Sequence, residues 1–153
     1  MADRTAPYPS YNFLVDWKGP NGPDTILGGF SDVSGLSTDI HVSEYRNGSE
    51  PEPHVRKIPG AHKVGDVTLK RGIVSSLDFW AWITETRKYG VEAKKEVVIT
   101  LRDESNAAVQ KYKLRGAIPL KYTGPTLSGK GAGDVAMEEI VLSVEGFEIE
   151  PAP

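Results

Sequence analysis

Three histidines are the residues of this sequence most able to bind a metal ion. His41, His54 and His62 lie in one segment at spacings of thirteen and eight residues, which matches no zinc-ligand pattern. The chain contains no cysteine, so thiolate metal sites, disulfides and a cysteine nucleophile are excluded together. The sequence therefore predicts no metal site and no cofactor.

The other candidates for chemistry are a glycine-rich stretch, the serines and clustered carboxylates. Residues 128–134 contain alternating glycines but lack the spacing of a dinucleotide motif and the Gly-Lys-Ser/Thr of a P-loop. No serine lies in a Gly-x-Ser-x-Gly motif, the usual setting of a hydrolase nucleophile. Asp103 and Glu104 adjoin at a predicted turn, where solvent screens both, whereas a general acid or base needs a sheltered site. We therefore predict that the protein is not an enzyme.

The composition is that of a globular domain. The 153 residues carry a formal net charge of −3 and are 39% hydrophobic and 25% charged, which excludes a disordered tail. Sixteen glycines and eleven prolines favour strands joined by turns over long helices. Residues 1–9 contain no apolar signal segment, and no lipid-attachment motif is present. We expect one domain over residues 1–153, assembled in the cytoplasm without a signal peptide or membrane anchor.

Alternating apolar and polar residues predict a mainly β fold. The segments with strand spacing are residues 11–17, 27–33, 67–71, 96–102 and 108–115. The first two form a hairpin around a turn at residues 20–23. Residues 118–122 form a short segment that a proline interrupts. Residues 135–149 fit both helix and strand spacing, although their valines and isoleucines favour a strand.

One short helix is predicted over about residues 76–89. Ser75 lies three residues before Asp78, as in an approximate capping box, and Gly90 ends the helix. The apolar side chains that we expect to cover one side or end of a sheet are Leu77, Phe79, Trp80 and Ile83.

Residues 38–65 form a long connection with few apolar residues. It contains three prolines and all three histidines. Connections of this length within a compact domain are usually functional or become ordered on contact with a partner. We expect an extended arm loop here, and a passive surface loop is the alternative.

Three cations, Lys111, Lys113 and Arg115, share one face of the predicted strand 108–115. Such a face implies a wetted surface. It either lines a channel, meets an acidic partner or protects an exposed sheet, and the last is the simplest interpretation.

Short motifs follow one another along nearly the whole chain. They include Tyr11-Asn12-Phe13, Phe30-x-x-Val33-Ser34-Gly35-Leu36, Glu44-Tyr45-Arg46-Asn47-Gly48, Lys57-Ile58-Pro59-Gly60, Val67-Thr68-Leu69-Lys70-Arg71-Gly72, Phe79-x-x-Trp82 and Glu138-Glu139-Ile140-x-Leu142. In this order the motifs resemble the tail tube proteins of contractile phages and contractile injection systems, a T4-like family related to the Hcp-like tube fold. The chain departs from the family at Asn106, where the turn often has glycine, and at Tyr112, where many relatives have tryptophan.

The resemblance implies a small antiparallel β-barrel or sandwich with one helix, forming homohexameric rings that stack into the inner tube of a phage tail or tail-like particle. It implies a contractile sheath, baseplate and spike proteins and tube-terminating proteins as partners, with effector cargo or DNA in the lumen. The arm has too few apolar residues to fold on itself, so we expect it to contact neighbouring subunits or rings. The residues expected at these contacts are Glu44, Tyr45, Arg46, Lys57 and Lys63.

The alternative function is a non-catalytic β-barrel binding module that recognises a glycan or peptide through Trp17, Trp80 or Trp82. Burial of all three tryptophans in the core is the simpler expectation. For the tube, we expect reversible and salt-screened charge contacts with the sheath rather than a hydrophobic seam.

Overall fold

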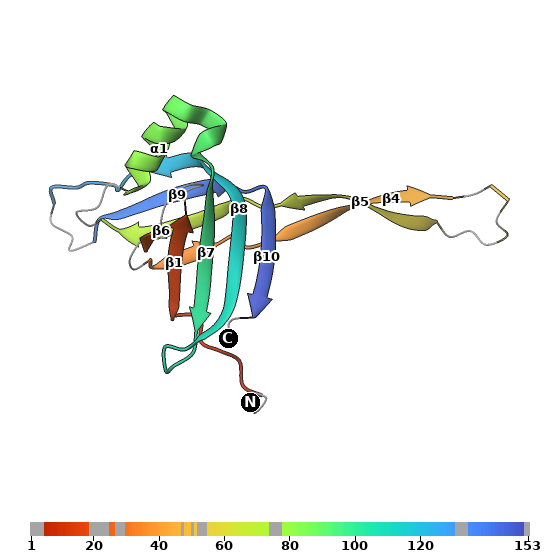
Figure 1. Cartoon of the computed structure of the whole chain (residues 1–153), viewed down its shortest axis with the longest axis horizontal. Helices are drawn as coiled ribbons and strands as arrows, with labels where there is room; N and C mark the ends of the chain where they lie inside the picture. The colour runs from red at the N-terminus through yellow and green to blue at the C-terminus, as the bar shows by residue number, and fades with distance from the viewer. Residues whose placement is uncertain are drawn as a thin grey trace.

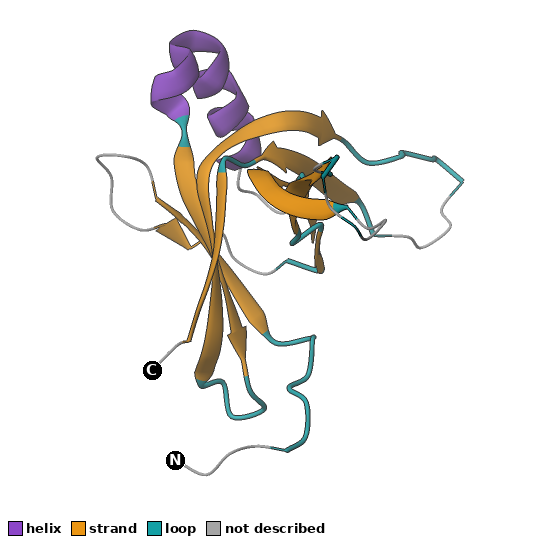
Figure 2. Cartoon of the chain, turned by 90° about the vertical axis from the view of Figure 1, so that its right-hand side faces the viewer, coloured by secondary structure: helices purple, strands orange, loops and turns teal. Residues whose placement is uncertain are grey.

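The computed structural model describes residues 5–18, 25–26, 30–46, 48–49, 51, 55–73, 78–130 and 135–151. Within these ranges the chain is mainly β with one α-helix (Figures 1 and 2). The elements are β1 (Phe13–Lys18), β2 (Thr25–Ile26), β3 (Asp32–Ser34), β4 (Thr38–Tyr45), β5 (Arg56–Val64), β6 (Val67–Gly72), α1 (Asp78–Tyr89), a 3₁₀ turn (Gly90–Ala93), β7 (Lys95–Arg102), β8 (Ala108–Thr123), β9 (Met137–Ser143) and β10 (Gly146–Pro151).

The long strand β8 belongs to two sheets, and all strand pairs described are antiparallel. Its first half lies between β7 and β10, and its second half pairs with β9. The first sheet therefore has the order β2-β1-β7-β8-β10, and the second has the order β8-β9-β6-β3. The two sheets pack as a sandwich around one core, and the described strands do not close into a barrel. The predicted β-rich fold with one helix is confirmed.

Gly116 lets β8 pass from one sheet to the other. Its φ of 62° bends the chain without ending the strand. Pro119 lies beside a register shift in the β8–β9 pairing, where a missing N–H is tolerated. The prediction of a separate, proline-broken segment at residues 118–122 was therefore wrong, because these residues continue β8.

The first predicted hairpin is only partly correct. β1 pairs with β2 and β7, whereas Val33 of β3 lies opposite Leu69 of β6 in the other sheet. The predicted turn at residues 20–23 lies outside the described residues. Residues 135–149 form strands β9 and β10, as their β-branched residues indicated.

The core lies between the inward faces of the two sheets and α1. It contains the fully buried side chains of Val15, Leu69, Val97, Leu114 and Ile140. Tyr11 shares the strand spacing of Val15 but is 73% exposed, because it precedes β1. Truncating a buried leucine such as Leu69 to alanine typically costs about 2–5 kcal/mol, so this core can hold the body of the chain together.

The helix α1 covers one end of the sandwich (Figure 1), and two of its aromatic residues face the core. Phe79 and Trp82 are buried, and the Trp82 ring meets Trp17 edge-on with a centroid distance of 4.9 Å. The Trp82 Nε1–H donates to the Ala93 carbonyl at 2.9 Å. Gly90, with a φ of 62°, follows the last helical residue, as predicted. The predicted cap at Ser75 and the side chain of Leu77 lie outside the described residues.

The segment over residues 38–65 projects from the body as a two-stranded hairpin, β4 and β5 (Figure 1). We call this segment the arm. The sequence predicted the position of the arm and its extended form, but it indicated a loop rather than two paired strands. Neither face of the hairpin is buried, so no apolar alternation signalled the strands. Pairing the two strands satisfies their backbone N–H and C=O groups without a core.

The two strands of the arm continue two neighbouring strands of the body. β3 leads into β4 through residues 35–37, and β5 leads into β6 through residues 65–66. Since β3 and β6 also pair with each other, the arm is an outgrowth of one antiparallel ladder.

Candidate functional site

The arm exposes all five residues that were predicted to contact neighbouring subunits. Register places Glu44 opposite Lys57 and Tyr45 opposite Arg56 across the hairpin, while Lys63 lies near the body opposite Asp39. These residues and the predicted contacts are exposed, with Tyr45 at 54%. The structure therefore gathers Glu44, Tyr45 and Lys57 toward the outer part of the arm and separates Lys63 from them.

Apolar side chains also lie exposed along the arm. The exposed members are Ile40, Val42, Tyr45, Val55 and Ile58. Exposed apolar groups are unfavourable in water, so contact of another chain with this narrow element would be favourable. The sequence showed these residues, but their spacing gave no sign that they share one exposed hairpin.

Tight backbone contacts hold the base of the arm. Gly35 has a φ of 85°, and a Cβ there would lie 2.1 Å from the Asp66 carbonyl oxygen. The Gly65 N–H donates to the Ser37 carbonyl at 3.0 Å, and a Cβ on Gly65 would lie 2.3 Å from the Ser37 Oγ. The position of Gly35 therefore requires glycine, whereas a Cβ on Gly65 would require the Ser37 hydroxyl to rotate away.

Two of the three cations of β8 form ion pairs with carboxylates of β10. Lys113 Nζ lies 3.0 Å from Glu150 Oε2, and Arg115 Nη2 lies 2.9 Å from Glu148 Oε2. Arg115 is exposed and Lys113 is half-buried. These two pairs neutralise part of the charge on this sheet face. The sequence showed the acidic residues near the end of the chain but did not predict that they would adjoin these cations.

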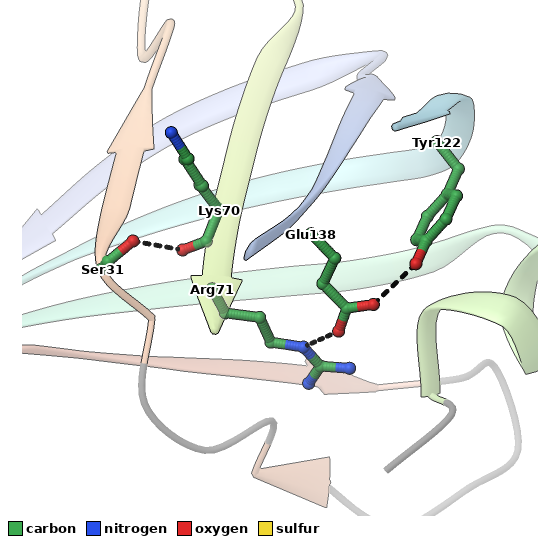
Figure 3. Close-up of polar contacts among 5 residues, drawn as sticks. All are labelled: Ser31, Lys70, Arg71, Tyr122 and Glu138. Carbon is green, nitrogen blue, oxygen red and sulfur yellow. Dashed lines mark hydrogen bonds and ion pairs between the residues drawn. The ribbon is translucent and has the colours of Figure 1, made fainter. Parts of the chain in front are cut away.

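A buried ion pair links the strands β6 and β9. Arg71 is 1% exposed, and its Nε donates to Glu138 Oε1 at 2.6 Å (Figure 3). The Arg71 guanidinium also lies 4.0 Å from the Phe79 ring centroid. The sequence contained a signal for this pair, because Arg71 falls on the same strand face as Val67 and Leu69.

Tyr122 completes this buried network from β8. Its hydroxyl donates to Glu138 Oε2 at 2.8 Å, so both carboxylate oxygens are engaged (Figure 3). Burial raises the pKa of the Tyr122 phenol, and the Glu138 carboxylate that accepts its hydrogen bond raises that pKa further. Beside it, the Ser31 hydroxyl donates to the Lys70 carbonyl at 3.1 Å and joins the chain before β3 to β6. The network ties β6, β8 and β9 together.

The tryptophans divide into two buried residues and one exposed residue. Trp17 and Trp82 are 5% and 1% exposed, as expected for core residues. Trp80 is 48% exposed, so the expectation that it is buried was wrong. On a helix, Trp80 points away from Phe79 and Trp82, which already fill the side that faces the core.

The described histidines do not form a metal site. His41 and His62 are exposed on the arm, and His54 lies outside the described residues. No group of three His, Cys, Asp or Glu side chains in the described ranges is placed to hold a metal ion. None of the helices described is long and apolar enough to cross a membrane.

Comparison with known proteins identifies the family. The model of the T4-like virus tail tube protein gp19 matches residues 9–148. Curated protein sequences gave no match. A chain of the PVC sheath-tube complex, an extracellular contractile injection system in the extended state, is 25% identical, with a TM-score of 0.80 and coverage of 97% of this chain and 94% of that one.

Two further structures agree with this result. A chain of the tube-terminating cap of the anti-feeding prophage is 25% identical, with a TM-score of 0.81 and coverage of 99% and 96%. Hcp1 from Flavobacterium johnsoniae shares the fold at 16% identity, with a TM-score of 0.51 and coverage of 91% and 96%. The chain belongs to the T4-like virus tail tube protein gp19 family and is a tail tube protein of the kind found in contractile injection systems.

Proposed function

We propose that the chain is the repeating, non-catalytic subunit of an inner tube, in which homohexameric rings stack around a lumen that holds effector cargo or DNA. The observation that carries this proposal is the family match over residues 9–148, combined with an exposed arm that has no core of its own. In each subunit residues 1–153 form one domain. A cysteine-free chain suits assembly in the reducing cytoplasm.

The other components of the particle follow from the same likeness. The related structures are a sheath-tube complex and a tube-terminating cap, so a contractile sheath and a terminating protein are proposed partners of this chain. A baseplate structure of the anti-feeding prophage contains a chain with the same fold, which supports baseplate and spike proteins as further partners.

Two kinds of surface would join the subunits. β2 and β10 each pair with one strand among those described, so both leave an edge open for a strand of the next subunit. The arm would reach a neighbouring subunit or ring through Glu44, Tyr45, Arg46, Lys57 and Lys63, and contact would cover its exposed apolar side chains.

Electron microscopy of the purified chain tests the tube. We expect rings or filaments with a central hole, whereas a compact monomer at high concentration would favour the alternative of a binding module. Replacing both Tyr45 and Arg46 with alanine should shorten the tubes or prevent them, because these side chains lie on the exposed arm.

A matched control is available on the helix. Lys88 and Tyr89 are also an adjacent cation and tyrosine, and Tyr89 is 53% exposed against 54% for Tyr45. The double alanine variant at these positions should assemble like the wild-type chain. Unchanged tube length and yield in the Tyr45/Arg46 variant would rule out the arm contact.

A further inference from the structure

An open groove lies between α1 and the second half of β8, and neither the described part of the arm nor the edge strands β2 and β10 line it. We call it the Trp80 groove. Its walls include Trp80, Arg87, Leu120, Lys121 and Tyr122. Trp80 is 48% exposed and Leu120 is 58% exposed, so two large apolar side chains face solvent at one place.

The aromatic wall of the Trp80 groove is held in position before any partner binds. The Trp80 ring meets the Tyr122 ring edge-on, with a centroid distance of 6.4 Å and an interplanar angle of 71°. The Arg87 guanidinium lies 5.3 Å from the Trp80 ring centroid. Tyr122 is itself fixed by the hydrogen bond from its hydroxyl to Glu138. A preorganised aromatic side chain binds with little loss of conformational entropy.

The charge of the groove indicates what kind of segment it could bind. Arg87 and Lys121 are its two charged residues, and no described residue that lines it carries a carboxylate. A cationic groove with an apolar floor suits an acidic segment that also carries an apolar side chain. The described arm residues do not fit, because they include the four cations Arg46, Arg56, Lys57 and Lys63 but only the two carboxylates Asp39 and Glu44.

We propose that the Trp80 groove is where the chain holds the contractile sheath, through an acidic segment of the sheath protein. In this contact an apolar side chain of the sheath packs against Trp80 and Leu120, and its carboxylates meet Arg87 and Lys121. The proposal rests on the proposed function, since it requires a tube enclosed by a sheath.

The composition of the groove also suits a contact that must separate when the sheath contracts. The two cations are at the surface, where salt and water screen charge pairs, so they contribute specificity with modest affinity. Trp80 supplies a single aromatic anchor of the kind that dominates binding energy at interfaces. We therefore expect the contact with the sheath to combine charged residues with one apolar anchor, rather than charged residues alone.

The test is to produce the whole particle with tube variants and to count, by electron microscopy, the tubes enclosed in an extended sheath. Trp80→Ala and Arg87→Glu should each form tubes of normal width but reduce enclosed tubes at least about tenfold. Arg87→Lys should retain much of the attachment because it keeps the positive charge.

The neighbouring cation provides the matched control. Lys88→Glu makes the same change of charge on the same helix outside the groove, and it should leave the enclosed fraction unchanged. Normal enclosure in both groove variants would overturn the proposal. Folded groove variants that form no tubes would also overturn it, because the groove would then join copies of this chain. If the wild-type chain itself formed no tubes, the proposed function would fail instead.

Discussion

The arm and the body of this chain satisfy the same backbone hydrogen bonds by different means. In the body, strands pair over a shared core in which Leu69 and Ile140 are fully buried. In the arm, β4 and β5 pair with each other while most of their side chains remain in solvent. An isolated two-stranded hairpin is marginally stable at best. The body is therefore stabilised by its own core, whereas the arm has only its backbone pairing and the contacts at its base.

The largest predicted difference is between a buried ion pair in the body and an exposed cation in the arm. Arg71→Ala should lower the free energy of unfolding by about 3–5 kcal/mol, because it leaves Glu138 buried without its cation. Lys57→Ala in the arm should change that free energy by no more than about 0.5 kcal/mol. Denaturant unfolding of the unassembled chain measures both. Similar losses from the two substitutions would contradict the contrast.

A second, smaller difference concerns the glycines at the base and toward the tip of the arm. Gly35→Ala should cost about 2 kcal/mol, since a Cβ would strike the Asp66 carbonyl and the residue has a positive φ. Gly48→Ala is the control, because nothing lies within 4 Å of its added Cβ, and it should change stability by less than about 0.5 kcal/mol. Thermal unfolding with tube yield checks both variants. A tolerated Gly35→Ala would show that the arm is not fixed at its base.

The smallest predicted effect is confined to the body and appears at alkaline pH. The raised pKa of Tyr122 means that the folded state prefers the protonated phenol. This contribution is complete below about pH 10, the pKa of an unfolded tyrosine, and is lost as pH rises through the higher folded pKa. The stability difference between wild type and Tyr122→Phe should therefore narrow above about pH 10. Urea unfolding at several pH values measures it, and a difference that does not vary with pH would refute the effect.

Sequence patterns predicted the body better than the arm for a physical reason. Residues such as Val97 and Ile99 alternate because one strand face is buried, and that alternation can be read directly. The arm has no buried face, so its strands left no such pattern. The continuation of β8 past Gly116 was also missed, because a glycine followed by a proline normally ends a strand.

The exposed surfaces were the hardest features to predict. The exposure of Trp80 depends on which side of α1 faces the sheets, and Phe79 and Trp82 decide this only once the fold has formed. Glu44, Tyr45 and Lys57 were predicted to lie on the arm. Their alignment across a hairpin was not predicted, because it depends on the register of β4 and β5.

The continuity of the arm with β3 and β6 has a mechanical consequence. β6 lies between β3 and β9, and only residues 65–66 separate it from the arm. In Figure 1 the arm and β6 run in nearly the same direction on opposite sides of the junction. A pull on the arm would thus act along β6. It would place the hydrogen bonds that β6 makes with β3 and with β9 in shear, so that many of them must break together rather than one at a time. The junction would therefore resist a force that pulls the arm away from the body.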